Sequence, residues 1–399
     1  MGNKTISKAS PTEGLSRIDG RLKVTGAAKY SAEFTMPGLV YGILVGSTIT
    51  KGTIKSIDTK AAKNAPGVVA IISHLNCPKV PGYQPVKGKP EQETYKLFYD
   101  NKIWFNGQPI AVVVANTFER ALYAASLVKA QYDADAPHTN LRDNFNKAYA
   151  PGYGGETKRG TEDAWKSAPV KLEQEYIIPS EVHSPMELHA IVARWDAEDK
   201  LTLWTKTQGV KDTQNGIQGI FKIPLENIQV NSKFVGGAFG SALQVWPHEV
   251  AAIIAAKVIK RPVKLVLGRA DMFTSVGYRP HTWQKIGMGA TADGKLIGIT
   301  HEAIGQTSSY EEFNEGPTGV SRSTYACPNV NTIYKLAALD IGKPTWMRGP
   351  GEATGAFALE SALDELSYAL NIDPVELRLK KLRGNRPGKR QGFFEQVFK

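Results

Sequence analysis

Cysteine is scarce in this chain of 399 residues, which has only Cys77 and Cys327, far apart in the sequence. The absence of a Cys-x-x-Cys pair excludes a cysteine-held iron–sulfur cluster and a structural zinc site of the usual kind. We expect both thiols to be buried and free rather than joined in a disulfide.

Long apolar runs are also absent, because no stretch approaches the ~20 residues that a membrane-spanning helix requires. The first eight residues, MGNKTISK, are polar and lack the apolar core of a signal peptide. We therefore expect no membrane span and a cytoplasmic location, with co-export to the periplasm on a partner's signal as the alternative.

Acidic residues are outnumbered, with 38 Asp and Glu against 49 Lys and Arg, for a net charge of +11. The charges are scattered, and the densest basic cluster lies at the extreme C-terminus, from Arg383 to Arg390. An anion- or nucleic-acid-binding module is an alternative, but net charge alone indicates solubility and loose association. We expect no nucleic-acid partner.

The first part of the chain predicts a β-rich α+β domain at 18–140, after a polar lead-in at 1–17. Three short runs rich in β-branched residues are typical of strands: 40–47, 67–72 and 110–115. Thr117 then opens a helix whose apolar residues are spaced to share one face: Phe118, Ala121, Leu122, Ala125 and Val128.

Residues 141–169 are polar and rich in turn signals, so we expect a linker there and a larger α/β domain at 170–382. Its expected strands are 171–178, 191–195, 201–204, 228–235 and 263–267. Its expected helices are 249–260 and 353–370, followed by a helix that Asp373 caps and Pro374 begins.

Glycines cluster in the segment 234–240, FVGGAFG, between an expected strand and an expected helix. Adjacent glycines let the backbone turn sharply and approach a ligand, and amides at such a junction favour an anion. The spacing is not that of the dinucleotide fingerprint. From spacing alone, a ligand loop and a tight structural turn are equally favoured.

Three other segments carry weaker signals. The loop 346–352, WMRGPGE, could clamp an anion with its arginine but is more typical of a surface turn. The segment 183–187, HSPME, with His189 beyond it, matches no standard metal-ligand spacing and favours a structural polar cluster. Gln208 follows an expected strand and indicates nothing alone.

Together these segments resemble the molybdenum-binding subunit of the xanthine dehydrogenase/aldehyde oxidase family, from about residue 15 to residue 382. Residues 20–34 and 106–115 are similar to its α/β-hammerhead domain, and 183–187 to the opening of its molybdopterin-binding domain. Similarity to the bacterial aldehyde oxidases rests on 245–248, 274–277 and 347–353. The resemblance implies an α+β fold: a hammerhead domain at 18–140, then the first half of the molybdenum-cofactor-binding domain at 170–382.

The resemblance also implies a cofactor, molybdenum–molybdopterin, either as such or as its cytosine dinucleotide. Its dithiolene sulfurs hold the metal, so no protein metal ligand is expected. Gln208 matches a glutamine that hydrogen-bonds an oxygen ligand of the metal, and Arg348 matches an arginine beside the cofactor. The residues expected to bind the cofactor are Gln208, Gly237, Ala238, Phe239, Gly240 and Arg348.

Three positions depart from the family pattern. Ala238 replaces a third glycine, and a positive φ there would strain it by roughly 1 kcal/mol or more. Leu243 stands where purine-oxidising members carry an acidic residue, and Pro350 stands in a loop that lacks their substrate-packing aromatic residue. These departures favour an aldehyde over xanthine.

By resemblance, the chain is part of an oxidoreductase that hydroxylates aldehydes or N-heterocycles with oxygen from water, and iron–sulfur and FAD subunits take the electrons. The family's basic glutamate lies in a second molybdopterin-binding half, and neither Glu352 nor Glu360 matches it. No catalytic residue is therefore expected here, and activity should require a polypeptide that carries the second half. The alternative is a non-catalytic truncated or pseudogene fragment. The basic tail at 383–399 is unlike the family's continuation, which suggests a frameshift or a split gene.

Overall fold

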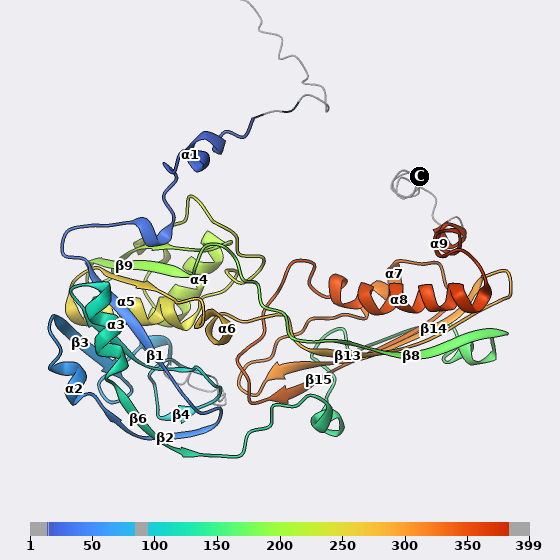
Figure 1. The fold of residues 1–399 in the computed structure, drawn as a ribbon, viewed down its shortest axis with the longest axis horizontal. Coiled ribbons are helices and arrows are strands. Elements are labelled where there is room, and N and C mark those ends of the chain that lie inside the picture. Colours follow the sequence, from blue (N-terminus) through green and yellow to red (C-terminus); the bar gives the residue numbers. More distant parts are fainter. Residues whose placement is uncertain (1–13, 15, 84–94, 383–399) are drawn as a thin grey trace, which may run out of the picture.

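Two bodies built on β-sheets lie side by side in the molecule (Figure 1). The computed structural model describes residue 14 and residues 16–83 and 95–382. Most of the predicted lead-in at 1–17 and the predicted tail at 383–399 lie outside the described residues. Both bodies combine helices with sheets, which confirms the predicted α+β class.

The larger sheet joins seven strands from distant parts of the chain. In spatial order they are β11 (Ile228–Asn231), β10 (Lys200–Thr205), β9 (Ala190–Ala197), β12 (Val263–Val266), β1 (Val40–Gly46), β5 (Pro109–Ala115) and β3 (Val68–Ser73). At its centre β1 runs parallel to β12, with Val40 opposite Val263. The predicted domain boundary at 141–169 therefore does not separate two sheets, because strands from both sides of it share one hydrogen-bonded ladder.

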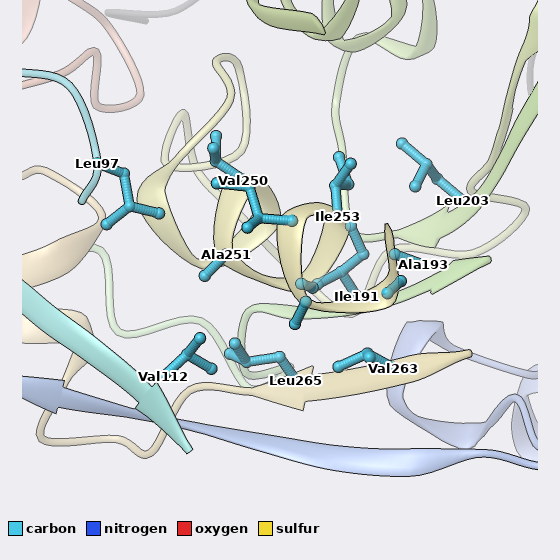
Figure 2. Close-up of a cluster of buried hydrophobic side chains, with 14 of the residues drawn as sticks. Leu97, Val112, Ile191, Ala193, Leu203, Val250, Ala251, Ile253, Val263 and Leu265 are labelled. Carbon is cyan, nitrogen blue, oxygen red and sulfur yellow. The ribbon is translucent and has the colours of Figure 1, made fainter. Parts of the chain in front are cut away.

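Helices cover both faces of this sheet, and every residue of β5 is buried as a result. Val112 and Val114 pack with α5 (Pro247–Ile259), whereas Val113 packs with α3 (Phe118–Ser126). Successive residues of a strand point to opposite faces, so the two helices lie on opposite sides of the sheet. Figure 2 shows the α5 side, where Val112 faces the helix.

The helix α3 begins as predicted, since the Thr117 hydroxyl accepts a hydrogen bond from the Arg120 amide at 3.3 Å. Its buried face differs from the prediction. Ala121, Ala124 and Ala125 face the sheet, whereas Phe118 is 41% exposed and Leu122 is 52% exposed. The small alanines of α3 are the side chains that pack against the sheet, and the two larger side chains are left partly in solvent.

A small sheet completes the first body, with β4 (Lys102–Ile103), β2 (Gly52–Asp58) and β6 (Lys129–Ala134). The other helices of this body are short except α4: α1 (Gly20–Val24), η1 (Ser31–Glu33), α2 (Lys60–Lys63), η2 (Pro81–Tyr83), α4 (Val210–Phe221), η5 (Leu225–Asn227) and α6 (Met272–Ser275).

Within the described part of the chain, no helix has both the length and the apolarity to cross a membrane.

The second body is a five-stranded sheet with a long helix on one face (Figure 1). Its strands, in spatial order, are β7 (Glu156–Arg159), β15 (Asn329–Leu339), β14 (Leu296–Ser308), β13 (Thr282–Ala290) and β8 (Val170–Ile178). Apolar residues of α8 (Glu352–Leu370) and α9 (Pro374–Leu382) pack on it, and α7 (Gly319–Ser323) contacts α8. Arg378 ties α9 to α8 through Glu360 at 2.7 Å and Asp364 at 2.7 Å.

The predicted linker at 141–169 belongs to this second body rather than merely connecting two domains. It contains η3 (Arg142–Lys147), β7 and η4 (Ala164–Ser167), and β7 pairs with β15. Trp165 is buried over Gly287 of β13, where any side chain would collide with the indole. Polar composition hid this arrangement, because β7 is an exposed edge strand and η3 and η4 each bury a single residue.

The cysteines fit the prediction only in part. Cys327 is buried, but Cys77 is half-buried, and the two form no disulfide with each other. Burial raises the pKa of the Cys77 thiol to about 11.

Candidate functional site

Gln208 lies just beyond β10, and its side chain is held by the glycine loop. Its Oε1 accepts hydrogen bonds from the backbone amides of Gly240 at 2.9 Å and Ala242 at 3.4 Å, and the Gln208 backbone amide donates to the Ala242 carbonyl at 2.9 Å. These contacts fix which way the carboxamide is turned. Within the described residues its Nε2 has no hydrogen-bond partner, so an exposed N–H donor is left available to a ligand.

The loop 237–240 has an unusual backbone in which three residues have positive φ: Gly237 at 93°, Phe239 at 57° and Gly240 at 111°. Ala238 is not among them, so the condition for strain at that position is not met. The strain falls on Phe239 instead, because the left-handed region costs a non-glycine residue about 1–2 kcal/mol. At Gly240 a side chain would collide with the carbonyl oxygen of Trp346, which explains the glycine.

Arg348 lies against this loop. Its amide donates to the Phe239 carbonyl at 2.9 Å, and its side chain is exposed. In the same loop, the Trp346 carbonyl lies 2.8 Å from His183 Nε2. Thus the structure brings together all the residues predicted to bind a cofactor: Gln208 reaches Gly240, and Phe239 reaches Arg348.

Sequence reasoning missed Arg279, which supports the Arg348 loop from behind. This buried guanidinium donates from Nη2 to the Arg348 carbonyl at 2.6 Å and lies 3.3 Å from a Glu181 carboxylate oxygen. A second carboxylate, that of Glu315, is 4.0 Å away and accepts a hydrogen bond from the Gly351 amide at 3.0 Å. No local pattern signals this network, because its members come from four separate segments.

The segment 183–187 serves the loop as polar scaffolding. Glu187 Oε2 accepts a hydrogen bond from the Gly236 amide at 2.7 Å, and Lys206 Nζ donates to the Glu187 carbonyl at 2.6 Å. Burial raises the pKa of Glu187 and lowers that of Lys206 to about 8. Within 16–83 and 95–382, no three His, Cys, Asp or Glu side chains gather as a metal site.

A buried layer beneath the loop fixes the residues that follow it. Ser241 Oγ donates to the Ala238 carbonyl at 2.8 Å and contacts His189 Nε2 at 3.0 Å. The Trp246 indole donates to the Ser241 carbonyl at 2.6 Å. Glu249, the third residue of α5, accepts a hydrogen bond from the Trp246 amide at 2.9 Å. Pro247 at the first position of α5 and Glu249 at its third are helix-start signals that could have drawn attention to this layer.

Above this scaffold the site is open. Phe239 is 46% exposed and Trp346 is 41% exposed, and the side chains of Gln208 and Arg348 are exposed beside them. The arrangement offers an amide donor, a guanidinium and a loop of sharply turned backbone on one surface. Such a surface suits an anionic, oxygen-rich ligand.

Profiles of two protein families match the chain. That of the molybdopterin cofactor-binding domain matches residues 139–382, and that of the aldehyde oxidase and xanthine dehydrogenase a/b hammerhead domain matches residues 25–136. Their order confirms the predicted hammerhead domain followed by a molybdenum-cofactor-binding domain.

Two curated proteins illustrate the similarity. The chain is 38% identical over 369 residues to the aldehyde oxidoreductase molybdenum-binding subunit PaoC of Escherichia coli (strain K12), covering 91% of this chain and 49% of that protein. It is 25% identical over 386 residues to the nicotinate dehydrogenase large molybdopterin subunit of Eubacterium barkeri, covering 91% and 87%. The chain thus spans about half the length of the first relative and most of the second.

A solved structure shares the fold. The aldehyde oxidoreductase from Desulfovibrio gigas superposes with a TM-score of 0.80 at 22% identity, covering 96% of this chain and 45% of that chain. At this identity the match concerns the fold alone.

Proposed function

Because the chain belongs to the xanthine dehydrogenase/aldehyde oxidase family of molybdopterin-binding oxidoreductases, we propose that it forms one wall of a molybdenum-cofactor site that a second polypeptide completes. The observation that carries the proposal is the gathering of Gln208, the 237–240 loop and the Arg348 loop on one open surface. An exposed wall with aromatic residues suits a site that another chain covers.

The chemistry of these groups fits the cofactor. The free Nε2 of Gln208 would donate to a cofactor oxygen, and the Arg348 guanidinium would bind an anionic group. The cofactor, when bound, would supply the metal that accepts electrons from the substrate. The part of this chain is to orient the cofactor, because the contacts of Ser241 and Arg279 hold both loops from behind.

The base for hydroxylation would come from the partner polypeptide that carries the second molybdopterin-binding half, and iron–sulfur and FAD subunits would carry the electrons away. The Eubacterium barkeri protein supports a divided arrangement. The present chain covers 87% of that protein, which is named a large molybdopterin subunit. We propose that the complex holds molybdopterin either as such or as its cytosine dinucleotide, and nucleotide released by acid treatment would distinguish the two forms. The proposed location is the cytoplasm, with co-export to the periplasm on a partner's signal as the alternative.

The proposed substrate is an aldehyde. Leu243, half-buried just beyond the loop, carries no charge with which to recognise a purine. The relative named as an aldehyde oxidoreductase subunit supports the same choice.

The test is co-expression with the polypeptides encoded beside the gene, followed by metal analysis and aldehyde-dependent dye reduction. We expect molybdenum in the complex, and a loss of activity of about 10- to 100-fold in Gln208→Ala. Gln218→Ala, an exposed glutamine on α4, is the matched control and should leave activity unchanged. A metal-free, aggregating chain would favour the non-catalytic fragment, and an unaffected Gln208→Ala enzyme would refute the assigned role.

A further inference from the structure

The turn from Arg348 to Gly351 is held at both ends by side chains from other parts of the chain. At the near end, Arg279 Nη2 donates a hydrogen bond to the Arg348 carbonyl at 2.6 Å. At the far end, Glu315 Oε1 accepts a hydrogen bond from the Gly351 amide at 3.0 Å. These two contacts fix the turn that carries the exposed Arg348 side chain, and so limit where its guanidinium can lie.

The two holding side chains are themselves anchored. Arg279 lies between α6 and β13, where its backbone pairs with that of Glu181 through hydrogen bonds of 2.9 Å and 3.2 Å. Glu315 lies between β14 and α7, and its Oε1 also accepts a hydrogen bond from the Thr354 hydroxyl of α8 at 2.9 Å. A Cβ at Gly351 would collide with the Glu315 carbonyl oxygen, so the turn and the Glu315 segment are in close contact.

Arg279 and Glu315 are also a buried pair of opposite charges. The side chain of Arg279 is 6% exposed and that of Glu315 is fully buried, with 4.0 Å between Arg279 Nε and Glu315 Oε1. The Glu181 carboxylate lies 3.3 Å from the same nitrogen, but its side chain is 47% exposed and water screens its charge. A buried ion pair is often no more stabilising than apolar residues of similar volume. Stability of the fold alone therefore does not account for this pair.

We propose that Glu315 is a positioning residue for the cofactor: its negative charge holds the Arg279 guanidinium in place, and Arg279 in turn holds the turn that presents Arg348. The inference rests on the proposed function, because Arg348 is the group that would bind an anionic part of the cofactor. Glu315 is buried, so it acts through Arg348 rather than by touching the cofactor. The requirement is for the charge of Glu315 as well as for a hydrogen-bond acceptor at that position.

The main test is Glu315→Gln, which keeps an acceptor for the Gly351 amide and removes the charge that faces Arg279. Hydrogen exchange of the loop 346–352 is measured by mass spectrometry on the full chain without cofactor, and molybdenum loss is measured on the co-expressed complex during dialysis. We expect loop exchange to be about tenfold faster and molybdenum loss about 10- to 100-fold faster than in the wild type. Glu360→Gln is the matched control, because it removes an arginine-paired carboxylate about two turns further along α8, and it should change neither quantity.

Two further variants separate positioning from a merely structural role. Arg279→Met should lower the melting temperature because it leaves Glu315 as an unpaired buried charge, and adding Glu315→Gln should restore part of that loss. Loop exchange and molybdenum loss should remain fast in the double variant, because no guanidinium then holds the Arg348 carbonyl.

Three results would each overturn the proposal: wild-type loop exchange in Glu315→Gln, wild-type molybdenum loss from a Glu315→Gln complex that holds the metal, or loop exchange that recovers together with the melting temperature in the double variant. A wild-type complex that never holds molybdenum would instead refute the proposed function. Loop exchange in the chain alone would then still decide whether Glu315 positions the turn.

Discussion

Replacing Glu249 with glutamine is expected to remove a pH dependence of folding stability between about pH 4.5 and about pH 7. The carboxyl is buried beneath the 237–240 loop and accepts hydrogen bonds from the Thr205 hydroxyl at 2.7 Å and the Trp246 amide at 2.9 Å. Burial nevertheless dominates and raises the pKa of Glu249 from 4.5 to about 7. The folded chain thus keeps this proton to a higher pH than the unfolded chain does.

The direction and size of the pH effect on stability follow from the difference between the pKa of Glu249 in the folded and the unfolded chain. Stability that derives from the protonated carboxyl is complete below about pH 4.5 and is lost as the pH rises through about 7. Each pKa unit corresponds to about 1.4 kcal/mol, so the loss amounts to about 3 kcal/mol. Glutamine resembles the protonated form, and the Thr205 hydroxyl can turn to the Ala190 carbonyl, which is 3.4 Å away. The variant should therefore not lose this stability.

The assay is urea unfolding of both proteins from about pH 4 to about pH 8, because all other titrating groups cancel in the difference between them. The exposed Glu226→Gln provides a matched change of charge. Infrared spectra should also show a protonated carboxyl near neutral pH in the wild type but not in Glu249→Gln. A stability difference that stays constant with pH would refute the reasoning.

Three further changes test close contacts. Gly240→Ala should displace the 237–240 loop, since its Cβ would collide with the Trp346 carbonyl. If the proposed cofactor site is correct, it should lower both the molybdenum content of the complex and its Tm, whereas Gly219→Ala should lower neither. Trp165→Ala should lower the free energy of unfolding by about 3–5 kcal/mol in urea titrations, and a cost below about 1 kcal/mol would contradict the packing described. Arg378→Met should cost about 1–3 kcal/mol and speed hydrogen exchange in α9 while α8 stays protected.

Local signals predicted much of the larger sheet correctly. The β-branched runs of β1, β5 and β9 and the cap of α3 are where the sequence indicates them, because these elements bury apolar residues at regular spacing. The strands β13, β14 and β15 escaped prediction. Gly287, Gly289 and Gly298 interrupt the first two, and glycine disfavours strands until Trp165 packs over it.

The candidate site was predictable only by resemblance. Gln208 carries no local signal, and its importance lies in a contact with Gly240 that the folded chain creates. The backbone strain that the sequence suggested for Ala238 lies at Phe239 instead, because the contacts that anchor the turn decide which residue has a positive φ. Spacing alone could not choose between a ligand loop and a structural turn.

The parallel pairing of β1 with β12 has a consequence for the order of folding. These neighbours are separated by roughly 220 residues of chain, so the loop-closure entropy of their pairing is large. During synthesis β1 emerges early but finds this neighbour only after β12 has left the ribosome. Until then one edge of β1 lacks its native partner, and unpaired edges invite aggregation. Folding of the first body is therefore expected to wait until β12 has been synthesised, and the nascent chain should be prone to aggregation during that interval.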